Sequence, residues 1–116
     1  MQEWDYNELT EYVEEVFCNS INDGLNALQA GGRCLNEFAN VIEEGETEKT
    51  IFYISLAHLQ IGKGILSVRI YEQVDDIIKV FDINNFVDEL GLNYAKDLSL
   101  RIESLKTKMQ SVEVIS

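Results

Sequence analysis

The segment TEKTIFYISLAHLQIG, residues 47–62, restricts the fold of this chain more than any other. Its apolar side chains would occupy nearly every side of a helix. A helix without a polar face is stable only when other parts of the chain cover it. The segment therefore predicts a central, buried helix around residues 48–62.

Apolar residues recur every three or four positions in several other segments, which is typical of amphipathic helices. Residues 5–30 predict one long helix that ends at Gly31-Gly32, with a kink or a close helix contact at Gly24. Residues 33–44 predict a shorter helix that ends at Gly45. The segment NNFVDEL predicts a short turn closed by Gly91, and residues 92–109 predict the last helix.

Residues 65–81 fit two patterns. Leu66, Val68 and Ile70 alternate as in a strand, whereas a helical spacing extends from Leu66 to Phe81. The helix accounts for more residues and is the prediction. The tail, residues 111–116, is expected to be frayed or to pair only in an oligomer.

These segments predict an all-α, compact, single-domain bundle of about five helices over residues 1–110. A length of 116 residues suits one domain, and the absence of proline suits uninterrupted helices. No run of eighteen apolar residues is present, so no membrane span is expected. The N-terminus is acidic from its third residue, unlike a signal peptide, and predicts a cytoplasmic protein.

Negative charge is concentrated in the first part of the chain. The net charge is −12, and residues 1–48 hold twelve acids and one base, Arg33. Nucleic acid and anionic membranes both favour lysine and arginine, so neither is an expected partner. A basic protein surface is the natural complement.

Two acidic groups form the predicted partner-binding site. On the first helix, acids three and four residues apart share one strip without a compensating lysine, although like charges at that spacing repel. Around Gly45, two further acids end a helix, where the helix dipole disfavours them. Tyr12 lies near the strip and is a candidate anchor. The predicted site residues are Glu8, Glu11, Tyr12, Glu15, Glu43, Glu44 and Glu46.

No cofactor, metal or catalytic residue is expected. His58 is the single histidine and has no glutamate at metal-binding spacing. Cys18 and Cys34 are expected to be buried thiols. Glu11-x-x-Glu14-Glu15 and Glu72-x-x-Asp75-Asp76 are similar to the magnesium-binding acids of nucleotide pyrophosphohydrolase bundles, but in a different order.

The sequence thus predicts a non-enzymatic acidic inhibitor that neutralises a basic partner protein. Its expected form is an immunity protein or antitoxin against a nuclease-type toxin, or a phage-type inhibitor of a nucleic-acid-binding enzyme. One alternative is a homo-oligomeric helical scaffold or adaptor, such as a homodimer. The other is a magnesium-dependent hydrolase related to the pyrophosphohydrolase bundles.

Overall fold

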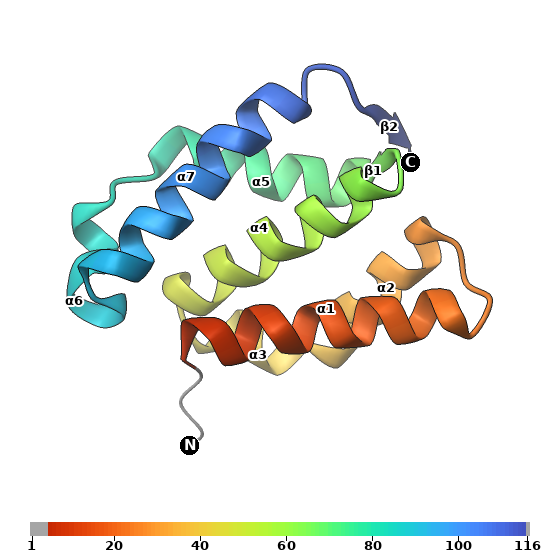
Figure 1. Ribbon diagram of the computed structural model, residues 1–116, viewed down its shortest axis with the longest axis horizontal. Coiled ribbons are helices and arrows are strands. Elements are labelled where there is room, and N and C mark those ends of the chain that lie inside the picture. Colours follow the sequence, from red (N-terminus) through yellow and green to blue (C-terminus); the bar gives the residue numbers. More distant parts are fainter. Residues whose placement is uncertain (1–4, 116) are drawn as a thin grey trace.

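The chain folds almost entirely into helices, which confirms the predicted all-α class. The computed structural model describes residues 5–115. Within this range there are seven helices, not about five, and two short strands. Figure 1 shows these elements in chain order: α1 (Tyr6–Asn22), α2 (Ala27–Glu37), α3 (Ala39–Glu44), α4 (Glu46–Gly62), β1 (Ile65–Ser67), α5 (Val68–Val80), α6 (Asn84–Leu90), α7 (Leu92–Lys108) and β2 (Glu113–Ile115).

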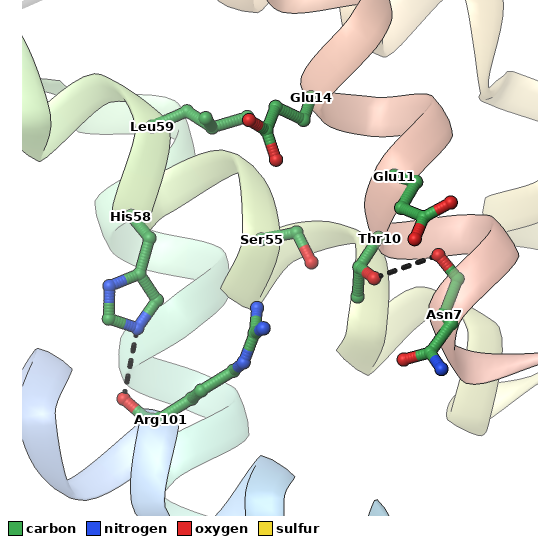
Figure 2. A pocket seen from close by; sticks show the side chains of 8 residues that line it. All are labelled: Asn7, Thr10, Glu11, Glu14, Ser55, His58, Leu59 and Arg101. Atoms are coloured by element: carbon green, nitrogen blue, oxygen red, sulfur yellow. Dashed lines mark hydrogen bonds between the residues drawn. The ribbon is translucent and has the colours of Figure 1, made fainter.

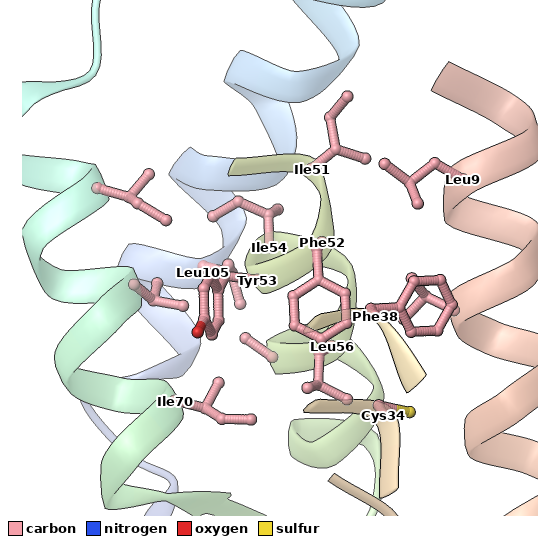
Figure 3. Close-up of a cluster of buried hydrophobic side chains, with 14 of the residues drawn as sticks. Leu9, Cys34, Phe38, Ile51, Phe52, Tyr53, Ile54, Leu56, Ile70 and Leu105 are labelled. Atoms are coloured by element: carbon pink, nitrogen blue, oxygen red, sulfur yellow. The ribbon is translucent and has the colours of Figure 1, made fainter. Parts of the chain in front are cut away.

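Helix α4 is the central helix that the apolar segment predicts. Residues 51–57 are all buried. α1 and α2 pack on one side of α4, and α5 and α7 pack on the other (Figure 1). Figure 3 shows the result: Phe52 and Leu56 of α4 point into a core shared with Leu9 of α1 and Ile70 of α5. Each such fully buried side chain contributes about 1.5–3 kcal/mol to folding.

The predicted helix over residues 5–30 is wrong in its extent, because the chain turns between α1 and α2. Gly24 has a φ of +97°, a conformation that glycine adopts without steric cost. Asn26 then begins α2. Its side chain accepts a hydrogen bond from the Gln29 backbone N–H at 2.8 Å, and the Gln29 side chain accepts one from the Asn26 N–H at 3.0 Å. This reciprocal capping box satisfies two N–H groups at the helix start.

Gly31 and Gly32 lie inside α2, so the prediction that they end a helix is also wrong. Gly31 faces the side chain of Gln60 from α4 so closely that a Cβ at Gly31 would overlap with the amide nitrogen. Gln60 is fully buried. Its amide nitrogen donates to the Ala27 carbonyl at 3.1 Å, and its amide oxygen accepts from the Ser67 N–H at 3.0 Å. Gly31 therefore allows α2 to approach α4, and Gln60 links both helices to β1.

The helix predicted over residues 33–44 is divided at Phe38, which lies between α2 and α3. The segment NNFVDEL is not merely a turn but helix α6, and Gly91 separates it from α7 with a φ of +83°. Among the described residues, no helix combines the length and the apolar character needed to span a membrane.

The helix predicted over residues 65–81 begins three residues late. Ile65–Ser67 form β1, and α5 starts at Val68, capped by the Ser67 hydroxyl, which accepts from the Ile70 N–H at 3.2 Å. β1 pairs in parallel with β2, with Ile65 opposite Glu113. Residues 113–115 of the tail, where fraying or pairing in an oligomer is expected, are therefore ordered against the same chain.

Candidate partner-binding surface

Helix α1 presents the first group of predicted site residues to solvent. Asp5 caps the helix, and its side chain accepts a hydrogen bond from the Glu8 N–H at 2.8 Å. Leu9, Val13 and Phe17 are buried. Since successive residues are about 100° apart on a helix, the acids of the strip face outward. Glu8, Glu11 and Glu15 are all exposed.

Tyr12 is at once part of this surface and part of the packing below it. Its ring meets the buried ring of Phe38 edge to face, with 5.0 Å between ring centroids. The residue is still 37% exposed. An aromatic side chain held by the core on one side and open on the other is a suitable interface anchor, because little side-chain entropy remains to be lost on binding.

The second group, Glu43, Glu44 and Glu46, is exposed around the junction of α3 and α4. Two contacts with α1 place this junction. Phe38, before α3, packs on Tyr12, and Ile51 of α4 points toward Leu9 (Figure 3). The segment from Phe38 to Ile51, which contains α3 and the start of α4, thus begins and ends beside the N-terminal half of α1.

Glu46 is oriented differently from its neighbours. It lines a hollow of about 410 Å³ that α4 forms with α5 and α6, together with Glu89 and Phe86. The structure thus groups Glu43 and Glu44 at the end of α3, whereas Glu46 borders a separate hollow.

Within residues 5–115, the carboxylates of this surface form no ion pair with a lysine or arginine. In the described part of the chain, ion pairs join Arg33 to Asp23, Lys79 to Asp75, Arg101 to Asp97 and Lys106 to Glu103. None includes a predicted site residue. The neighbouring Asp5 raises the pKa of Glu8 by hydrogen bonding and by its charge, with smaller contributions from desolvation and from Glu11. Repulsion between the acids of the strip is therefore present in the folded protein.

A polar groove of about 500 Å³ lies on the other flank of α1 (Figure 2). Its lining residues come from three helices: Asn7, Thr10, Glu11 and Glu14 of α1, Ser55, His58 and Leu59 of α4, and Arg101 of α7. Of these, only Glu11 belongs to the predicted site. A signal for the groove exists in the sequence, because Ser55 and His58 are polar residues three positions apart within the largely apolar stretch 51–59 and must share one face of the helix.

Hydrogen bonds between α1 and α7 support the wall of the groove. The Tyr6 hydroxyl donates to Asp97 at 2.6 Å, and the Arg101 Nε donates to the same carboxylate at 3.1 Å. The Arg101 guanidinium lies 5.7 Å from the centre of the Tyr6 ring. Burial, the hydrogen bond to Asp97 and the Asp97 charge raise the pKa of Tyr6, so the hydroxyl keeps its proton.

His58 closes the groove toward α7. Its Nε2 lies 3.1 Å from the Arg101 carbonyl oxygen, to which a protonated Nε2 donates. Burial lowers the pKa of His58, and the charges of Lys108 and Arg101 act in the same direction, against the raising effect of that hydrogen bond. The side chain is thus a neutral packing residue at physiological pH.

The acids similar to those of the pyrophosphohydrolase bundles lie on different helices, α1 and α5, and Asp75 pairs with Lys79 at 2.9 Å. Over residues 5–115, no three histidine, cysteine, aspartate or glutamate side chains come together as a metal site would need. Both cysteines are free; Cys34 is buried as expected, but Cys18 is exposed. The arrangement provides a charged surface and gives no support to a magnesium centre.

Comparison with known proteins relates the chain to a protein family. A family model described as "Immunity protein Imm3" matches residues 2–116, nearly the whole chain. No curated protein and no solved structure matches the chain.

Proposed function

The chain belongs to the Imm3 family of immunity proteins and is thus an inhibitor of a toxin, and we propose that its target is a basic toxin that acts on nucleic acid. In this proposal the acidic surface of α1 and of the α3–α4 junction covers the toxin's nucleic-acid-binding surface. In this proposal the protein acts by binding, without catalysis, and in the cytoplasm.

The observation that supports this target is the set of exposed carboxylates without cationic partners. A surface that serves only solubility gains from alternating charges, because Glu–Lys pairs on a helix stabilise it and like pairs destabilise it by a few tenths of a kcal/mol. Here Glu8, Glu11 and Glu15 share one helix face, and no lysine or arginine among the described residues pairs with them. A toxin that binds phosphates would supply the missing cations.

The same surface suggests how binding proceeds. Complementary charge accelerates association by about 10- to 1,000-fold at low ionic strength. The Tyr12 ring, supported by Phe38, would then be buried at the centre of the interface. The carboxylates would occupy positions on the toxin that phosphates otherwise occupy, and nucleic acid would be excluded.

The experiment is a measurement of association rates between the purified toxin and charge-reversed variants. Glu11→Lys and Glu43→Lys alter the proposed surface, and Glu72→Lys is the matched control, since Glu72 is exposed on α5 and forms no ion pair with any described residue. We expect each surface variant to associate about tenfold more slowly at low salt, and the difference to shrink at high salt. The control should slow association by less than about twofold, which is the part that the change in net charge alone explains.

Equal slowing by all three variants would mean that only net charge matters, and no slowing would mean that the toxin binds elsewhere. Either result would overturn the proposed surface. Tyr12→Phe keeps the ring contact with Phe38 and should leave the association rate unchanged, whereas Tyr12→Ala should mainly accelerate dissociation.

A further inference from the structure

Ser55 is a polar residue in the wall of the groove. It lies on the central helix α4, is only 5% exposed, and forms no hydrogen bond with any described residue. Figure 2 shows its hydroxyl pointing into the groove, between Thr10 of α1 and the Arg101 guanidinium of α7. Over residues 5–115 no buried polar side-chain atom lacks a hydrogen-bond partner, so the Ser55 hydroxyl is open to the groove and available to a ligand there.

The rest of the groove offers mainly hydrogen-bond acceptors. The Glu11 and Glu14 carboxylates have no ion-pair partner among residues 5–115. The Asn7 amide nitrogen is used, since it donates to the Tyr94 hydroxyl at 3.0 Å, and the amide oxygen is left to accept. The Thr10 hydroxyl donates to the Asn7 carbonyl at 3.0 Å and retains its own lone pairs.

The one cation in the groove is already neutralised. Arg101 donates to Asp97 at 3.1 Å and lies over the Tyr6 ring. His58 is held neutral by burial and by the positive charges near it. The charge left without a partner is therefore that of Glu11 and Glu14, and the groove favours a positively charged occupant.

We propose that this groove receives an arginine side chain of the toxin. Its guanidinium would donate to Glu14 and Ser55 inside the groove and to Glu11 at the rim. A guanidinium has five N–H donors in a fixed plane, which matches acceptors contributed by two helices. The volume of about 500 Å³ falls in the range of ligand pockets, about 300–1,000 Å³.

The inference rests on the proposed function, because it assigns one contact of that interface. It also makes two residues determinants of specificity: Glu14, on the flank of α1 that faces α4 and α7, and Ser55 of α4. The α1 helix would then use both flanks: the strip with Tyr12 on one side and an arginine socket on the other.

The test is an NMR titration of the ¹⁵N-labelled protein with N-acetyl-arginine methylamide, a neutral-backbone mimic of one arginine residue. The matched compound is N-acetyl-citrulline methylamide, which has the same shape without the charge. We expect saturable shifts of the amide signals of Ser55, Glu14 and their neighbours with the arginine compound only. Glu14→Gln and Ser55→Ala should each weaken binding roughly fivefold to tenfold, the loss of about one charge-assisted hydrogen bond.

Glu72→Gln is the control, since Glu72 is exposed on α5 and does not line the groove. It should leave the affinity within about a factor of two, because an exposed charge outside the groove does not contact the ligand and is screened by salt. Equal shifts with the citrulline compound, equal weakening by Glu72→Gln, or no saturable shifts would each overturn the arginine socket. Such a result would leave the proposed function intact if Glu11→Lys and Glu43→Lys still slow association with the toxin.

Discussion

The two adjacent glycines of α2 should respond in opposite ways to the same substitution. At a helical glycine, alanine stabilises the fold by about 0.5–1 kcal/mol, because alanine has less backbone freedom to lose. Gly32 is exposed and has open space where a Cβ would be. Gly32→Ala should therefore stabilise the protein by about that amount.

Gly31→Ala should be destabilising, because the new methyl group would overlap with the Gln60 amide nitrogen. That amide cannot move freely: it is fully buried and bonded to the Ala27 carbonyl and the Ser67 N–H. Each buried group left unsatisfied costs about 1–3 kcal/mol. After the gain in helix propensity, the net loss should be about 1–3 kcal/mol.

Urea unfolding followed by circular dichroism measures this difference. With a slope of about 1–3 kcal/mol per molar urea, the unfolding midpoints of the two alanine variants should differ by roughly 1 M. In a Gln60→Ala background the overlap is gone, and Gly31→Ala should become stabilising like Gly32→Ala. A Gly31→Ala variant as stable as Gly32→Ala in the natural background would refute the proposed contact between α2 and α4.

Three further predictions concern single side chains. Burial lowers the pKa of His58 below its unfolded value of about 6.5, so the unfolded state binds the proton first and the protein loses stability as pH drops below about 6.5. His58→Gln should reduce the fall of the urea midpoint between pH 7 and pH 5, and an equally steep fall in the variant would contradict this. Tyr6→Phe removes the hydroxyl that donates to Asp97 at 2.6 Å and should lower the free energy of unfolding by about 1–2 kcal/mol, whereas an unchanged urea midpoint would mean that the bond contributes nothing. Burial raises the pKa of Cys34 to about 12, while Cys18 is exposed. A thiol reagent at pH 8 should therefore modify Cys18 of the native protein quickly and Cys34 only on unfolding, and two fast reactions would show that Cys34 is accessible.

The central helix could be predicted from the sequence because its evidence is local. Sixteen consecutive residues with apolar side chains on nearly all sides leave no alternative to burial, and α4 follows that prediction closely. The break between α1 and α2 also has a local signal that the prediction did not use. Asn26 and Gln29 have the spacing of a capping box, and Gly24 precedes them.

Gly31 and the 65–67 segment could not be interpreted in the same way, because their structure depends on distant partners. Gly31 is needed inside a helix only because Gln60 of α4 lies against it. β1 is a strand because β2 pairs with it, 48 positions along the chain from Ile65 to Glu113. Spacing within a short window carries no information about such contacts.

The acidic surface that we propose binds the toxin was predictable in charge but not in shape. The outward position of Glu8, Glu11 and Glu15 follows from the period of the helix alone. The groove depends on α7 returning beside α1 and α4, with Asp97 bonded to Tyr6 over a separation of 91 residues. From the sequence alone, Glu14 is therefore indistinguishable from the other surface acids of the first helix. Its position in the groove is apparent only from the folded structure.

The most direct test of the proposed function is competition for the toxin. A catalytically inactive toxin would be bound to a fluorescent oligonucleotide and titrated with the immunity protein, with fluorescence anisotropy as the readout. If the acidic surface covers the nucleic-acid-binding surface, the oligonucleotide should be displaced completely, and Glu11→Lys with Glu43→Lys should displace it less effectively than Glu72→Lys. A stable complex of toxin, oligonucleotide and immunity protein would contradict the account.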